Sequence, residues 1–113
     1  AVVPEMAVRL SGRVITIGGA PGLDPRLGVG QSAYAAAKAG VLAFTQALAH
    51  EVWHQEVKVN CLVPSVIVPL SESKAQDGVT PEQIVATIRY LLSREADHIT
   101  GAVIRAFGSK KFS

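Results

Sequence analysis

The sequence of 113 residues predicts an α/β fold, a partial doubly wound parallel sheet of about three strands in a single domain, residues 1–113. Segments with helical spacing alternate with short β-branched runs, in the order helix, strand, helix, strand, helix, strand. The strand segments are apolar on both faces, which is typical of parallel strands that helices cover on both sides. Because three strands make a narrow sheet, we expect it to be part of a wider one.

The N-terminal half supplies the first three elements. Residues 1–10 have the apolar spacing of the last turns of a helix. Arg13–Ile17 is a β-branched run that predicts a buried strand, and Gly19–Gly30 is rich in Gly and Pro, which predicts a loop. Ser32 is then expected to cap a long Ala-rich helix that runs to about His54.

The C-terminal half repeats the alternation. Val57–Leu62 predicts a second strand, and Pro64–Val79 a loop with a polar tip. A Thr-Pro pair places Pro81 at the first position of a helix that is expected to run to about Ser93. Ala102–Ala106 predicts the third strand.

Composition excludes several classes of protein. Hydrophobic residues make up 49% and charged residues 18%, so the chain is expected to fold around a core. Eleven basic and nine acidic residues form no run of like charge, which gives no case for binding nucleic acid or an anionic membrane. The longest apolar run is interrupted by two prolines and is shorter than the roughly 20 residues of a spanning helix. The single cysteine, Cys61, cannot form an internal disulfide, which fits a cytoplasmic location.

Tyr34 and Lys38 lie one helical turn apart on the long helix, so their side chains share a face. A cation close to a phenol favours the phenolate form. A tyrosine in that setting can give or take the proton of an alcohol or carbonyl oxygen while a hydride moves elsewhere. The pair is a weak signal by itself, because many helices contain a tyrosine and a lysine at this spacing.

The segment HEVWH, residues 50–54, matches the H-E-x-x-H motif of zinc hydrolases. A catalytic zinc usually has three protein ligands, and the residues after His54 supply no obvious third. Glu72, Asp77 and His98 are distant candidates, and nothing selects one of them. We therefore assign no metal ligands and keep the zinc hydrolase as a remote alternative.

Five segments in order extend the Tyr34–Lys38 signal: GRVITI, QSAYAAAKAGVLAFTQALAHE, VKVNCLVPS, PEQI and ITGAVI. In this order the chain resembles the C-terminal half of the short-chain dehydrogenase/reductase family over essentially its whole length. The resemblance implies a Rossmann-like sheet, NAD or NADP as cofactor, and a small carbonyl or alcohol as substrate. It also implies a homo-oligomer, associated through the helix that ends near Leu10 and the helix that carries Tyr34.

The resemblance also implies roles for particular residues. Tyr34 would be the catalytic acid/base, and Lys38 would favour its phenolate form and hold the ribose hydroxyls of the cofactor. The segment beside the nicotinamide ring would consist of Pro64, Ser65, Val66 and Ile67.

Departures from the family pattern are expected to affect catalysis and cofactor binding. Gly19 stands where the family has its catalytic serine, and Pro69 replaces a threonine that would bind the carboxamide. The Gly-rich turn that holds the cofactor pyrophosphate at a helix N-terminus is not in this sequence. The chain begins without Met inside an expected helix, so we expect a fragment, or a chain that needs a missing N-terminal half. The alternative is a non-catalytic interaction module that uses the open edge of the strand Arg13–Ile17.

Overall fold

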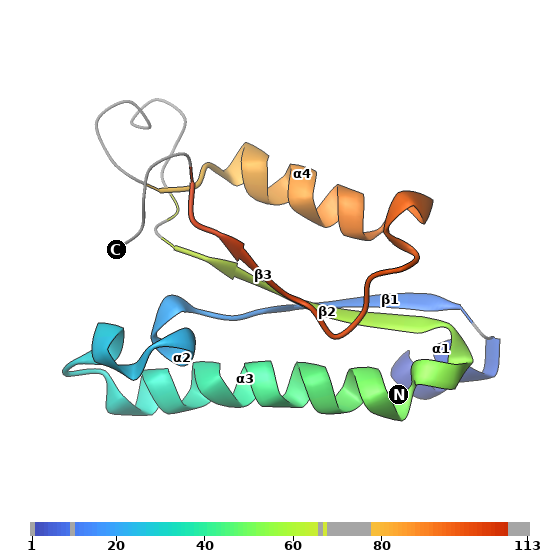
Figure 1. Ribbon diagram of the computed structural model, residues 1–113, viewed down its shortest axis with the longest axis horizontal. Coiled ribbons are helices and arrows are strands. Elements are labelled where there is room, and N and C mark those ends of the chain that lie inside the picture. Colours follow the sequence, from blue (N-terminus) through green and yellow to red (C-terminus); the bar gives the residue numbers. More distant parts are fainter. Residues whose placement is uncertain (1, 10, 66, 68–77, 109–113) are drawn as a thin grey trace.

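The predicted α/β architecture is confirmed in a computed structural model, which describes residues 2–9, 11–65, 67 and 78–108 (Figure 1). The helices are α1 (Val2–Arg9), α2 (Ala20–Leu23), α3 (Ser32–Glu51) and α4 (Pro81–Leu91). The strands are β1 (Gly12–Ile17), β2 (Val57–Pro64) and β3 (Val103–Ala106). Short 3-10 turns are η1 (Pro25–Gly28), η2 (Trp53–Gln55) and η4 (Arg94–Ala96).

The sheet is parallel, with β2 between β1 and β3. Helices α1 and α3 lie on one side of it and α4 on the other, which explains why the strands are apolar on both faces (Figure 1). β2 is the core strand, since Val59, Cys61, Leu62 and Val63 are fully buried. In the part of the chain described, β1 pairs with a strand on one side only, so its other edge is open.

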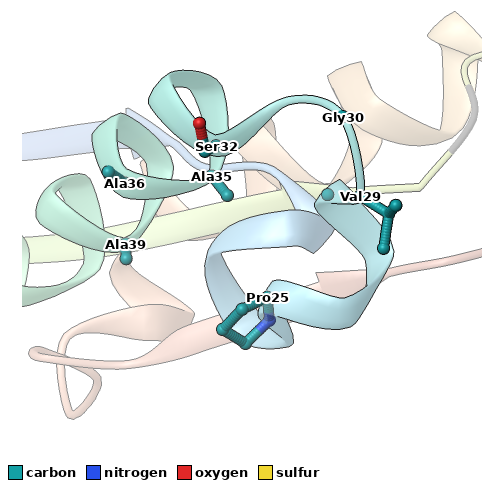
Figure 2. A pocket seen from close by; sticks show the side chains of 8 residues that line it. Pro25, Val29, Gly30, Ser32, Ala35, Ala36 and Ala39 are labelled. Atoms are coloured by element: carbon teal, nitrogen blue, oxygen red, sulfur yellow. The ribbon is translucent and has the colours of Figure 1, made fainter.

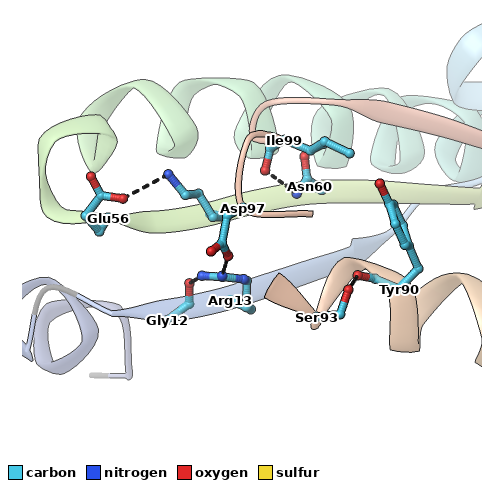
Figure 3. Close-up of polar contacts among 9 residues, drawn as sticks. Gly12, Arg13, Glu56, Asn60, Tyr90, Ser93, Asp97 and Ile99 are labelled. Atoms are coloured by element: carbon cyan, nitrogen blue, oxygen red, sulfur yellow. Dashed lines mark hydrogen bonds and ion pairs between the residues drawn. The ribbon is translucent and has the colours of Figure 1, made fainter. Parts of the chain in front are cut away.

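A buried asparagine joins the central strand to the turn before β3. The side-chain amide of Asn60 donates to the carbonyl oxygen of Ile99 at 3.2 Å (Figure 3). Its side-chain oxygen accepts from the backbone N–H of Ala102 at 3.0 Å. At the amino end of β1, Arg13 pairs with Asp97 (Figure 3). Both contacts join the segment just before β3 to another strand of the sheet. They therefore set the position of β3 against the sheet.

Several predicted boundaries were wrong. Ser32 is the first residue of α3 and not its cap: Gln31 occupies the cap position, without a side-chain hydrogen bond. The helix ends at Glu51, after which η2 forms and Glu56 takes a left-handed conformation (φ 58°) that turns the chain into β2. β2 extends to Pro64 because its last residues still pair with β3. β3 begins at Val103, and α4 ends at Leu91 rather than near Ser93.

The segment Gly19–Gly30, predicted as a loop, contains α2 and η1. Pro21 lies in the first turn of α2, where a missing N–H costs nothing. Asp24 caps η1 by accepting from the backbone N–H of Arg26, and its carboxylate also accepts from the Arg26 guanidinium. These hydrogen bonds from Arg26 lower the pKa of Asp24 below its usual value. Glycine and proline therefore mark tight helical turns here, and not irregular chain.

Candidate active site

Tyr34 and Lys38 lie in the first turns of α3, beside the carboxyl end of β1. The Lys38 ammonium is 5.7 Å from the centroid of the Tyr34 ring. It also donates a hydrogen bond to the carbonyl oxygen of Ile17 at 3.2 Å. The Tyr34 side chain remains 48% exposed. The pair thus combines a fixed cation with a phenol that solvent or a ligand can reach.

The two glycines that follow β1 face different environments. A Cβ placed on Gly19 would lie 3.0 Å from the hydroxyl oxygen of Tyr34 and 3.1 Å from Cγ of Lys38. A Cβ on Gly18 would instead meet Val63 and Cys61 in the core. Position 19 is therefore the one at which a side chain would touch the Tyr34 hydroxyl. Glycine leaves that place without a side-chain donor.

The predicted nicotinamide segment follows β2 at the same edge of the sheet. Pro64 ends β2, and Ser65 is tied to the residues after β3: its N–H donates to the Ala106 carbonyl oxygen at 3.3 Å and its hydroxyl to that of Phe107 at 3.0 Å. Ile67 is 54% exposed and forms a parallel bridge with Val79. Val66 and Pro69 lie outside the described residues. Since the strands are parallel, their carboxyl ends place this segment on the same side of the sheet as Gly19.

Gly22 is a residue that sequence reasoning missed. A Cβ on Gly22 would lie 2.6 Å from the carbonyl carbon of Lys38 and 2.7 Å from the backbone nitrogen of Ala39. Helix α2 can therefore pack directly on the backbone of α3 behind the Tyr34–Lys38 pair. The Gly/Pro density of this segment was a signal, but it was interpreted as a loop.

Replacing Gly22 by alanine is expected to lower the free energy of unfolding by about 1–3 kcal/mol, because the added methyl group meets main-chain atoms that cannot rotate away. Urea denaturation measures the change. Gly40→Ala is the matched control: Gly40 lies in α3, and apart from its chain neighbours and the backbone of its own helix no described atom lies within 4 Å of the added Cβ. That control should raise stability by about 0.5–1 kcal/mol, since alanine favours a helix over glycine. A Gly22→Ala protein as stable as the Gly40→Ala protein would contradict this close packing.

HEVWH does not form the helical pair of a zinc site. His50 and Glu51 end α3, whereas His54 lies in the separate turn η2. The His50 ring stacks on Trp53, with centroids 6.4 Å apart. Within the described ranges, no group of three or more His, Cys, Asp or Glu side chains is placed to hold a metal ion.

The same part of the chain has no helix long and apolar enough to cross a membrane.

Comparison with known proteins agrees with this geometry. The short chain dehydrogenase family model matches residues 1–78. A 3-oxoacyl-[acyl-carrier-protein] reductase of Chlamydia muridarum is 35% identical over 96% of this chain and 48% of its own length. A cyclohexanol dehydrogenase of a Rhodococcus species is 30% identical over 100% of this chain and 47% of its own length.

Solved structures give the same result. A short chain dehydrogenase/reductase family oxidoreductase from Burkholderia thailandensis superposes with a TM-score of 0.80 at 25% identity, over 95% of this chain and 48% of that one. The three-stranded parallel sheet with helices on both faces is part of a Rossmann-type fold. The chain belongs to the short-chain dehydrogenase/reductase family. It spans about half the length of the curated relatives it matches.

Proposed function

We propose that this chain is the catalytic part of an NAD(P)-dependent oxidoreductase that interconverts a small carbonyl compound and the corresponding alcohol. The observation that carries the proposal is the grouping of Tyr34, Lys38 and the carboxyl end of β1. The similarity to a 3-oxoacyl reductase and to a cyclohexanol dehydrogenase supports a ketone or secondary alcohol as the substrate class.

In the direction of reduction, the Tyr34 hydroxyl donates its proton to the carbonyl oxygen of the substrate. The nearby Lys38 ammonium stabilises the phenolate that results. Because Tyr34 is half exposed, water can return the proton. A nicotinamide cofactor, when bound, would supply the hydride that completes the alcohol. Oxidation of an alcohol reverses these proton transfers.

Lys38 and the segment after β2 fit the nicotinamide and ribose end of such a cofactor. Lys38 uses one N–H for Ile17, and an ammonium group has further donors that can bind ribose hydroxyls. Pro64, Ser65, Val66 and Ile67 would lie along the nicotinamide. The Gly19–Gly30 segment lacks the G-x-G-x-x-G spacing and folds as α2 and η1, so it does not fit a pyrophosphate. We propose that residues of a preceding N-terminal half, in the same or another polypeptide, hold that part, and that the protein is a cytoplasmic homo-oligomer.

Titration of NADPH, then NADH, into the purified chain tests the proposal, with Trp53 and nicotinamide fluorescence as the readout. Weak but saturable binding is expected, because by this proposal the chain holds only the nicotinamide–ribose end of the cofactor and not the pyrophosphate. Lys38→Met should weaken it at least about tenfold, because a charge-assisted hydrogen bond contributes about 1.5–3 kcal/mol. Arg89→Met, a change of an exposed cation on α4, is the control and should leave binding unchanged. No binding of either cofactor to the folded chain, or equal binding by both variants, would contradict the proposed site.

The second candidate is a non-catalytic module kept for assembly with other chains. Gly19 favours it, since no side chain there can assist Tyr34. The open edge of β1 favours it too, because an unpaired strand edge can accept another strand. Under this hypothesis, changes at Tyr34 and Lys38 have no functional effect.

A further inference from the structure

Thr45 is the one buried polar residue of α3, and the mechanism does not use it. The structure describes all 20 residues of this helix, and only Thr45 and Ala49 among them are buried. Ala49 contributes a methyl group, whereas Thr45 is 0% exposed and carries a hydroxyl. Apolar contacts are not directional, but a buried hydroxyl needs hydrogen-bond partners in defined directions. The helix that carries the Tyr34–Lys38 pair is thus held at depth by one directional side chain.

The Thr45 hydroxyl links α3 to β1. Its oxygen lies 2.6 Å from the hydroxyl oxygen of Thr16 and 2.7 Å from the carbonyl oxygen of Val41, one turn earlier in the helix. The Thr16 hydroxyl is also 3.5 Å from the Asn60 carbonyl oxygen, which is long for an O–H···O bond. Because each hydroxyl has one proton to donate, the two short contacts fit one arrangement: Thr16 donates to Thr45, and Thr45 donates to Val41. The strand is thereby tied to the main chain of the helix.

Three side chains on one face of α3 lie against the end of β1 and the residues after it: Tyr34, Lys38 and Thr45. They share that face because residues seven and eleven apart differ by only about 20° in direction at about 3.6 residues per turn. Their counterparts, in the same order, are Gly19, Ile17 and Thr16. Since these numbers fall as the helix numbers rise, α3 runs antiparallel to β1. The contact with Thr16 therefore lies about two turns from Lys38 on the face that carries the site.

We propose that Thr45 is a positioning residue for the Tyr34–Lys38 pair. Its hydrogen bond with Thr16 fixes the rotation of α3 about the helix axis, and therefore the place of the phenol and the ammonium beside Gly19. A rotation of about 10° moves an atom about 6 Å from the axis by about 1 Å. Misplacement by about 1 Å can lower a reaction rate about 10²-fold. This inference deepens the proposed oxidoreductase function and rests on it.

The other contacts of this part of α3 fix its rotation less closely. Lys38 reaches the end of β1 through a flexible four-carbon chain, so its ammonium follows the helix rather than orienting it. Val41 and Leu42 are only partly buried, and Phe44 is 58% exposed. Thr45, by contrast, is β-branched and has few rotamers, and its bond to the Val41 carbonyl holds one of them.

Acetylation of Lys38 in the full chain without cofactor tests this role. The probe is N-hydroxysuccinimidyl acetate at limiting concentration, and mass spectrometry gives the labelling rate of Lys38 relative to Lys58, a lysine at the amino end of β2 in an ion pair with Glu56. Thr45→Val keeps the shape of the side chain and removes the hydroxyl. We expect it to raise the Lys38 to Lys58 ratio about two- to tenfold, the effect of one lost hydrogen bond, because Lys38 is then held less closely at Ile17.

Two further variants separate the hydroxyl from a general loosening of the chain. Thr45→Ser keeps the donor and should restore the ratio of the parent chain. Thr87→Val is the matched control: the Thr87 hydroxyl makes the same kind of bond, to the Gln83 carbonyl oxygen one turn earlier at 3.0 Å, but on α4. It should leave the ratio unchanged. An unchanged ratio with Thr45→Val, or an equal rise with Thr45→Ser or Thr87→Val, would overturn the proposal.

Thr16→Val tests the same contact from its less buried end, and so does not depend on tolerance of valine at position 45. It should raise the labelling ratio as Thr45→Val does. The double variant should raise it no further, because both changes remove one and the same hydrogen bond. Additive effects of the two changes would show that each threonine acts alone, and would overturn the role of the contact.

Steady-state kinetics and the cofactor titration separate this inference from the enzyme proposal. In a chain that turns over a ketone, Thr45→Val should lower kcat about 10²-fold with little change in the KM for the ketone, and Thr45→Ser should restore kcat. A labelling change without NADPH or NADH binding would remove the enzyme proposal and leave Thr45 as the residue that positions Lys38. Cofactor binding together with unchanged labelling would remove the role of Thr45 only.

Discussion

Tyr34→Phe is expected to reduce turnover of a ketone or secondary alcohol by about 10²–10⁴-fold, the usual contribution of a positioned general acid or base. The variant lacks the hydroxyl that gives and takes the proton but keeps the aromatic ring beside Lys38. We expect the thermal midpoint and the affinity for NADPH to change little, because the side chain is 48% exposed. The measurement is steady-state kcat and KM together with a thermal unfolding curve.

Tyr90→Phe is the matched control. Tyr90 lies on α4, away from the candidate site, and is 44% exposed, close to the exposure of Tyr34. It should leave kcat unchanged. If the parent chain turns over substrate and Tyr34→Phe does so at the same rate, then Tyr34 is not the acid/base and the proposed mechanism fails.

Gly19→Ser is expected to raise kcat by about 10²–10³-fold, the effect of one positioned hydrogen-bond donor to a developing oxyanion. A side chain at position 19 begins 3.0 Å from the Tyr34 hydroxyl oxygen, so a serine hydroxyl would lie beside the reacting carbonyl oxygen. The neighbouring contact is with Cγ of Lys38 at 3.1 Å, and both side chains are flexible enough to shift by a few tenths of an ångström.

Gly19→Ala separates the hydroxyl from the added volume. It adds the same Cβ without a donor, so it should leave kcat unchanged or lower it slightly. A rate gain shared by serine and alanine would show that the Cβ repositions Tyr34, and would contradict the hydrogen-bond explanation. An unchanged rate with serine would mean that this site does not depend on a donor at position 19.

Tyr34→Phe and Gly19→Ser together distinguish the oxidoreductase from the non-catalytic module. An enzyme whose rate falls with Tyr34→Phe and rises with Gly19→Ser uses the family's proton chemistry with one donor missing. A chain that responds to neither, but still associates through α3, fits the non-catalytic module.

Much of the fold follows from local patterns. Alternating β-branched runs and helical spacing predicted the parallel sheet, because side-chain periodicity reflects which faces are buried. That the Tyr34 and Lys38 side chains lie close together was predicted equally well, since residues four apart in a helix share one face. The ends of the helices and strands were predicted less accurately. Ser32 has the chemistry of a helix cap, but Gln31, one residue earlier, occupies the cap position.

The surroundings of the site depend on contacts between distant segments. The sequence shows two adjacent glycines, but the path of the chain after β1 makes Gly19 face Tyr34 and Gly18 face the core. The contact of Gly22 with the α3 backbone and the hydrogen bond from Lys38 to Ile17 likewise join residues 16 and 21 positions apart. Local periodicity carries no information on such distances. The residue types and their helical spacing therefore define the chemistry available, and the packing of α2 and α3 on the end of β1 defines which atoms can take part in it.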